Sequence, residues 1–326
     1  MLPLPFPGLR EVNAYLLADD SGSTIIDCGM LLPDAEDGDD GWSQLVEALA
    51  ACDHTPKDIS RLICTHTHID HYGLAARLKA ESGCEIVIHE AGNEELDVLR
   101  DPEKISQRLR ETYADHGIKG DELDDLTSYE DWRRFVTGVV EADTWVTGTE
   151  SFDVGGRSWE LVHTPGHARS HICLFERQAS LLISGDHLLG SITPHIDFHR
   201  GVGDPLGDFL ESLGKVERLA PEMVLPGHGR PFFDGAERAR ATLRHHERRL
   251  GAIIQVVRRQ ACSADRITKE IFGRTLLHFE KRLGLGEALA HIHYLRVRGE
   301  IERTDAPDGT RLYRKASRRP VQEVPE

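Results

Sequence analysis

Four side chains that can bind a metal ion lie within six residues of this chain. They are His66, His68, Asp70 and His71, in the segment His66-Thr67-His68-Ile69-Asp70-His71. Imidazole and carboxylate groups are the usual donors to zinc and related divalent metals. Side chains two residues apart in an extended loop point the same way, so His66 and His68 can bind one ion, while Asp70 and His71 face a second. The spacing predicts a metal centre rather than a solvated polar loop.

Secondary-structure signals around this segment, together with three later apolar segments, indicate how further metal ligands would come close to these four side chains. The β-prone run 61–65 precedes the segment, and a helical run ending in Gly follows it. Apolar runs at 159–164, 180–185 and 223–225 are each followed by one donor beside a glycine: His167, Asp186 and His228. Any one of these alone would be interpreted as a turn, core or capping residue. Together they predict donors that converge where several strands end.

The order THTHIDHYG, TPGHARSHICL, SGDHLL and LPGHG resembles the metallo-β-lactamase superfamily of hydrolases over roughly residues 10–235. The resemblance implies an α/β chain folded as a four-layer αββα sandwich. It also implies two divalent metal ions, most simply Zn²⁺, with iron or manganese as alternatives. The ligands it implies are His66, His68 and His167 for the first metal, Asp70, His71 and His228 for the second, and Asp186 as the bridge; Asp27 would support them from behind.

The resemblance further implies hydrolysis by a hydroxide shared between the two metals, with Asp70 and Asp186 as the catalytic carboxylates. Penicillin hydrolysis is not the first expectation, because antibiotic-degrading members generally lack the full ligand pattern. Four other polar residues lie close to the motifs in the sequence. They are candidates either for substrate contact or for support of the loops: Tyr72, His187, His195 and His199.

The charge of the chain is divided unevenly along its length. The 326 residues carry a net charge of −16, of which residues 1–235 contribute −24 and residues 236–326 contribute +8. An acidic chain is a poor candidate for general nucleic-acid binding. No apolar run is long enough to span a membrane, and residues 1–17 do not resemble a signal peptide. We therefore expect a cytoplasmic protein with reduced cysteines and no membrane partner.

The change of net charge near residue 235 and the positions of the motifs predict the domain organisation of the chain. A catalytic domain covers 1–235, with a helical cap insertion at about 91–143. A linker helix covers 236–262, a winged-helix-like domain 263–316, and a tail 317–326. Apolar side chains of the insertion would either wall the substrate cleft or pack its helices onto the sandwich. They are Leu96, Leu99, Leu109, Tyr113, Trp132 and Phe135.

A small acyl compound is the preferred substrate class, either a thioester such as an acyl-CoA or a lactone. The intact donor set and the acidic body favour it. The alternative is an endoribonuclease or phosphodiesterase that uses the same metal centre and holds phosphates with the basic C-terminal region. Nucleic acid is thus the less favoured partner, and a homodimer stays open.

Overall fold

The computed structural model describes residues 1–6, 9–20, 22–33, 40–127, 132–198, 201, 203–273 and 278–317. The chain forms two compact units. Unit 1 comprises residues 1–102, 130–194 and 209–240, and unit 2 comprises residues 103–129, 195–208 and 241–326. Each unit is described by itself.

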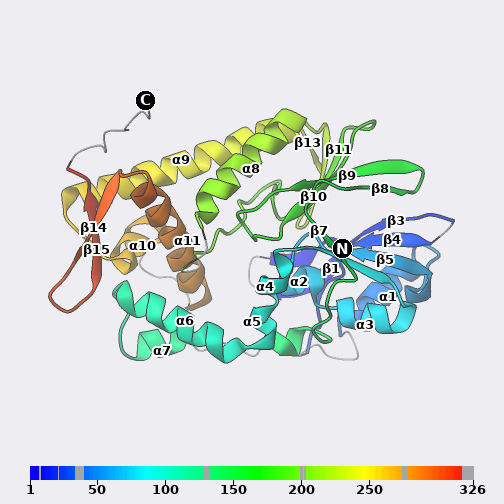
Figure 1. Ribbon diagram of the computed structural model, residues 1–326, viewed down its shortest axis with the longest axis horizontal. Helices are drawn as coiled ribbons and strands as arrows, with labels where there is room; N and C mark the ends of the chain where they lie inside the picture. The colour runs from blue at the N-terminus through cyan, green and yellow to red at the C-terminus, as the bar shows by residue number, and fades with distance from the viewer. Residues whose placement is uncertain are drawn as a thin grey trace. The chain divides into compact units, whose positions relative to one another are not determined.

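Two β-sheets form the centre of unit 1 (Figure 1). The first has the strand order β3-β4-β5-β6-β7, in which β4 to β7 run parallel. Alternate side chains of a strand face opposite sides of its sheet. Leu62 of β5 accordingly packs with the helices on one face, and Ile63 packs toward the second sheet. The strands of this sheet are β3 (Tyr15–Leu17), β4 (Ser23–Ile26), β5 (Ile59–Ile63), β6 (Glu85–His89) and β7 (Thr144–Val146).

The second sheet has the order β13-β12-β11-β10-β9-β8. Trp159, Leu161 and Ile172 pack from this sheet against Ile26 and Val87 of the first, which forms the apolar interior of the sandwich. Burial of these side chains is the main driving force for stacking the sheets. The strands are β8 (Ser151–Val154), β9 (Arg157–His163), β10 (Ile172–Glu176), β11 (Leu181–Gly185), β12 (Met223–Pro226) and β13 (Phe232–Phe233).

Helices cover the sandwich from outside. Trp42 and Leu45 of α1 and Leu78 of α3 pack on the first sheet, whereas Ser212 of α8 donates to the Pro165 carbonyl beyond the end of β9. The remaining elements of unit 1 are the hairpin β1 (Leu2–Phe6) and β2 (Leu9–Val12), the helices α1 (Trp42–Ala50), α2 (Ile69–Tyr72), α3 (Ala75–Ser82), α4 (Gly92–Glu95) and α5 (Asp97–Arg100), α8 (Pro205–Leu219) from residue 209 on, and the 3₁₀ turns Pro56–Asp58 and Trp132–Phe135.

Unit 2 is a helical assembly that ends in a β-hairpin. Leu109, Ile253, Leu289 and Tyr313 are among the buried residues of its core. Its elements are α6 (Pro102–Asp115) from residue 103 on, α7 (Asp121–Thr127), α9 (Gly235–Arg259) from residue 241 on, α10 (Ala264–Phe272), α11 (His278–Val297), β14 (Ile301–Asp305) and β15 (Arg311–Lys315). Helices followed by a hairpin match the element order predicted for residues 263–316; the winged-helix assignment itself stays a prediction.

A buried polar cluster joins α9 to α11 within unit 2. The Nδ1 of His246 lies 3.1 Å from the Nε2 of His291, and the His291 Nδ1 lies 2.7 Å from the Glu287 carbonyl oxygen, to which it donates. The Glu287 carboxylate accepts from Arg249. With Nδ1 as the donor of His291, its Nε2 accepts a hydrogen bond from His246. The cluster therefore links the two helices by polar contacts.

The insertion predicted at 91–143 is helical, but its apolar side chains belong to two different cores. Leu96, Leu99 and Phe135 pack in unit 1, whereas Leu109 and Tyr113 pack in unit 2. These contacts support the packing alternative over a cleft wall. The domain boundaries stay a prediction, and residues 318–326 of the expected tail lie outside the described residues. No helix in the described parts of the chain is long and apolar enough to cross a membrane.

Candidate metal centre

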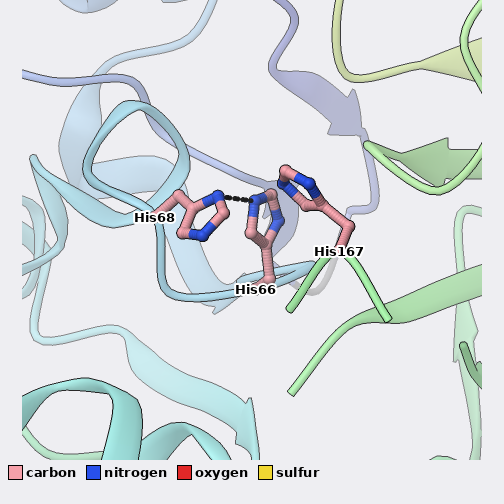
Figure 2. A group of neighbouring side chains, drawn as sticks. All are labelled: His66, His68 and His167. Atoms are coloured by element: carbon pink, nitrogen blue, oxygen red, sulfur yellow. Dashed lines mark hydrogen bonds between the residues drawn. The ribbon is translucent and has the colours of Figure 1, made fainter. Parts of the chain in front are cut away.

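Three histidine rings from two loops converge at one edge of the sandwich (Figure 2). His66 and His68 lie on the loop between β5 and α2, and His167 lies on the loop after β9. The Nε2 of His66 and the Nδ1 of His68 are 3.0 Å apart, and the ring centroid of His167 lies 4.5 Å from that of His68. The donor nitrogens of the three rings are all within 4.8 Å of one another. Such a spacing suits one shared ion.

A second group of donors adjoins the first. It contains Asp70, His71 and His228, whose donor atoms also lie within 4.8 Å of one another. Asp70 and His71 come from α2, and His228 follows β12. The Nε2 of His228 is 3.3 Å from the Asp70 Oδ2, and the Nε2 of His71 is 3.6 Å from the same oxygen. The structure thus brings together the second set that the resemblance implied.

Asp186 lies between the two groups. Its Oδ2 is 3.5 Å from the His167 Nε2 and 3.3 Å from the His228 Nε2, and its Oδ1 is 3.4 Å from the His71 Nε2. One carboxylate therefore faces donors of both sets, as a bridging ligand would. Asp186 directly follows β11, so the parallel pairing of β11 with β12 places it beside the loop of His228.

A glycine beside Asp186 makes this close approach possible. A Cβ at Gly227 would lie 2.3 Å from the Asp186 Oδ1 and 2.9 Å from the His71 Cε1. Both distances are far below van der Waals contact. The Gly-His pair in LPGHG is thus explained by packing at the centre as well as by turn formation.

Asp27 lies behind the two donor sets. Its carboxylate accepts from the Thr65 backbone N–H at 2.7 Å, from the Thr65 hydroxyl at 2.9 Å and from the His71 Nδ1 at 2.8 Å. This last bond leaves the His71 Nε2 directed at Asp70 and Asp186. His228 is fixed in the same way, because its Nδ1 donates to the Glu11 carbonyl oxygen at 2.6 Å. Such bonds select the tautomer and ring orientation of a metal ligand.

His171, which is not among the four candidates taken from the sequence, has a positioning role. Its Nε2 accepts from the backbone N–H of Asp186 at 3.0 Å, and its Nδ1 lies 2.8 Å from the Thr164 hydroxyl. The ring is fully buried. His171 therefore holds the Asp186 backbone in place and is not a member of the donor groups.

The donors fit divalent cations on electrostatic grounds. Burial alone would lower the pKa of His71, but the carboxylates of Asp186, Asp70 and Asp27 outweigh it and hold that pKa well above its usual range. The pKa of His228 rises to about 10 against the same burial, chiefly because of Asp186. The pocket of carboxylates thus strongly favours positive charge, which two dications would supply in place of protons.

Buried polar atoms without hydrogen-bond partners also indicate that the centre binds cations. Among the described residues, the His71 Nε2, the His228 Nε2 and the Asp186 Oδ1 are buried without a hydrogen-bond partner of acceptable geometry. Leaving such atoms unsatisfied costs free energy, whereas coordination of a cation would satisfy all three. The residues present therefore fit the metal pair that the fold implies.

The four candidates for substrate contact are placed differently. Tyr72 is fully buried in the core, and its hydroxyl both donates to the Val140 carbonyl and accepts from the Val140 N–H, each at 2.6 Å. His187 is also fully buried and packs on Phe209. These placements argue for packing roles. His195 belongs to unit 2, where its Nδ1 is 3.7 Å from the Glu287 Oε2, and His199 lies outside the described residues.

Comparison with known proteins identifies the family. The model of the metallo-beta-lactamase superfamily matches residues 7–228, and that of the metallo-beta-lactamase-like C-terminal domain matches residues 250–316. The chain therefore belongs to the metallo-beta-lactamase superfamily and is a hydrolase of that fold, which confirms the resemblance. The fold implies divalent metal ions, and the two donor clusters of unit 1 provide for them.

Individual relatives extend over most of the chain. A protein described as "Probable metallo-hydrolase YqjP" from Bacillus subtilis (strain 168) is 25% identical, covering 98% of this chain and 97% of that protein. An atrochrysone carboxyl ACP thioesterase from Aspergillus fumigatus is 25% identical over 74% of this chain and 58% of its own length. A crystal structure of a metallo-beta-lactamase family protein from Thermus thermophilus aligns at a TM-score of 0.82 with 26% identity, covering 96% of both chains.

Proposed function

We propose that this protein hydrolyses a thioester of a small acyl compound with a pair of divalent metal ions, most simply Zn²⁺. The observation that carries the proposal is the convergence of two donor sets on Asp186. Two bound dications would lower the pKa of water to near neutrality and polarise the substrate carbonyl. A lactone is the alternative acyl substrate.

The side chains of the centre have distinct tasks in this scheme. The pKa of Asp70 falls to about 2, because the attraction of His71 and His228 outweighs the effect of burial. Its carboxylate thus stays ionised at neutral pH and can orient the attacking water by accepting its hydrogen. Asp186 holds the two donor sets together, while Asp27 and His171 fix the orientation of His71 and Asp186.

The composition of the centre favours a thioester over an amide. Apart from His187, which is fully buried against Phe209, the ionisable side chains that the structure describes around Asp186 are predicted ligands or their supports. They are thus committed to the metals rather than to protonation of a leaving amine. A thiolate leaves without such help, because thiols have a pKa of about 8.5. The thioesterase among the relatives supports the same substrate class.

The test is an activity panel with the metal-loaded protein. It contains acyl-CoA thioesters, lactones, bis-p-nitrophenyl phosphate and single-stranded RNA. We expect thioester turnover that is abolished by chelation and by His68→Ala or Asp186→Ala, but retained by His54→Gln, a histidine outside the centre. Turnover that survives both centre variants, or complete chelation, would disprove the metal mechanism. Cleavage of RNA alone would replace the thioesterase assignment with the ribonuclease alternative.

A further inference from the structure

Unit 2 contains a cavity of about 280 Å³ whose rim is basic. Three arginines line it: Arg296 from the end of α11, Arg303 from β14 and Arg311 from β15. Three guanidinium groups around one cavity are costly unless an anion compensates their mutual repulsion. The cavity is distinct from the donor clusters of the metal centre, all of which belong to unit 1.

Local carboxylates neutralise only part of this charge. Arg303 forms a two-point pair with Asp305, from its Nε at 2.9 Å and its terminal nitrogen at 3.1 Å, and Arg311 pairs with Asp115 at 2.6 Å. A guanidinium has five N–H donors, so both arginines keep donors for a further ligand. Arg296 forms no ion pair with the residues that the structure describes, and its side chain is exposed. The rim therefore retains one uncompensated positive charge and a surplus of donors.

The remainder of the lining is apolar and aromatic. Leu289 and Ile292 of α11 are buried beneath the cavity, and Phe198 and His293 contribute two rings with centroids 5.3 Å apart. Tyr313 adds a hydroxyl 3.3 Å from the His116 Nδ1. A basic rim over an apolar, aromatic floor suits an anion attached to a flat or apolar group. Planar guanidinium forks bind the oxygens of phosphate and carboxylate groups in two-point contacts, and a phosphate offers more oxygens to three arginines.

We propose that this cavity binds the phosphorylated, nucleotide-like end of the substrate's carrier, as found in coenzyme A. The identification of the carrier rests on the proposed thioesterase function, whereas the preference for a phosphorylated group rests on the cavity alone. Arg296, Arg303 and Arg311 would contact phosphate oxygens, and the rings of Phe198 and His293 would contact the base. Recognition of the carrier would thus be assigned to unit 2.

Titration calorimetry of the full-length protein tests this proposal. Its ligands are coenzyme A, dephospho-coenzyme A and pantetheine. We expect affinity to decrease in that order, because each ligand has fewer phosphates than the one before. Arg296→Ala and Arg303→Ala should each weaken coenzyme A binding about tenfold, the loss expected for a charge-assisted contact. Arg314→Ala is the matched control, since Arg314 lies on the same hairpin and pairs with Glu302 but does not line the cavity.

A kinetic comparison separates this proposal from the proposed function. The KM for an acyl-CoA should rise about tenfold in Arg296→Ala with kcat little changed, because the lost contact binds the carrier and not the reacting carbonyl. Hydrolysis of an acyl-N-acetylcysteamine, which carries no phosphate, should not change. Pantetheine binding as tight as that of coenzyme A, or arginine variants that bind like wild type, would overturn the cavity assignment while thioester turnover stands. Binding of single-stranded RNA in place of coenzyme A would overturn it as well.

Discussion

At the scale of single residues, the side chains behind the ligands determine the centre as much as the ligands do. Asp27 binds Thr65 and His71 together, and it does so from a left-handed backbone conformation with φ of 59°. Asp tolerates this region better than most residues, because its short side chain can bond locally. Asp27 therefore combines a left-handed backbone conformation with an acceptor for His71.

His171 offers the sharpest test of such support. His171→Ala removes the acceptor of the Asp186 backbone N–H and leaves that group buried without a partner. We expect metal affinity and kcat/KM to fall about 10- to 100-fold, the usual effect of removing a residue that orients ligands. Metal content measured by plasma mass spectrometry, together with thioester kinetics, checks this. A variant with full metal content and wild-type kcat/KM would show that His171 serves only packing.

The proximity of the first four candidate donors was predictable because their spacing is local. H-x-H-x-D-H is confined to one loop and one turn of helix, so its chemistry can be read without knowing the fold. The interaction of His171 with Asp186 was not predictable, because it depends on where β11 lies beside the loop after β9. For Tyr72 and His187 the sequence left substrate contact and loop support open, and their full burial favours support. Each directly follows a predicted ligand, and neighbouring residues in a helix or strand point in different directions.

At the scale of elements, the loops that follow the strands pack so closely at the metal centre that they restrict which residues fit there. The loop after β12 approaches Asp186 so closely that residue 227 has no room for a side chain. Sequence alone indicated a turn here, for which glycine is one of several common residues. The structure adds that glycine is required by the neighbouring carboxylate.

Gly227→Ala is therefore expected to be much more harmful than a glycine replacement elsewhere. The new methyl group would force Asp186 or His71 to move, with an expected loss of about 1–3 kcal/mol of stability and of most metal binding. Gly251→Ala is the control, because its Cβ meets no atom within 4 Å and alanine favours the helix interior of α9. Thermal melts and metal titrations of both variants measure the difference. Equal effects would refute the steric argument.

The buried polar cluster that links α9 to α11 makes the stability of unit 2 sensitive to low pH. Burial lowers the pKa of His246 to about 3 and that of His291 to about 4. Both rings are neutral in the folded protein, whereas the unfolded chain protonates them near pH 6.5. The unfolded state thus binds more protons as the pH falls from about 6.5 to about 4, and stability decreases over that range. The pKa of Glu287 also falls, to about 2, because His195 and Arg249 outweigh its burial, and this adds a loss below about pH 4.

Hydrogen exchange of α11 measures this effect. Each imidazole should contribute about 1–2 kcal/mol of lost stability between pH 7 and pH 5. His195 acts in the opposite direction, because the bond to Glu287 raises its pKa despite burial, and it offsets part of the loss. His246→Gln should reduce the pH dependence of protection in α11, whereas Arg314→Ala should leave it unchanged. If the hydrogen-exchange protection of α11 does not vary between pH 7 and pH 5, the conclusion that His246 and His291 are neutral in the folded protein is wrong.

At the scale of the whole molecule, the αββα fold was predictable because its signal is repeated. Several apolar runs of strand length each lead into a donor, and only a sheet edge brings such loops together. The sequence did not predict in which hydrophobic core each helix of the insertion at 91–143 would pack. Its helices α5 and α6 are adjacent in sequence, yet Leu99 packs in one core and Leu109 in the other. Amphipathic periodicity shows that a helix buries a face, but it does not show against which core.

Chelation should affect the two units unequally. All donors of the metal centre, with Asp27 and His171 behind them, belong to unit 1, so removal of the metals leaves its buried carboxylates and unsatisfied nitrogens without their cations. A ligand present at about 1,000 times its Kd stabilises a fold by about 4 kcal/mol, and two such ions would contribute more. Hydrogen exchange before and after chelation should therefore show lost protection in β5, β11 and the loops that follow them. The core of α9, α10 and α11 should keep its protection. Equal loss in both units would mean that the metals stabilise more than the sandwich, and no loss in unit 1 would mean that the clusters hold no ion.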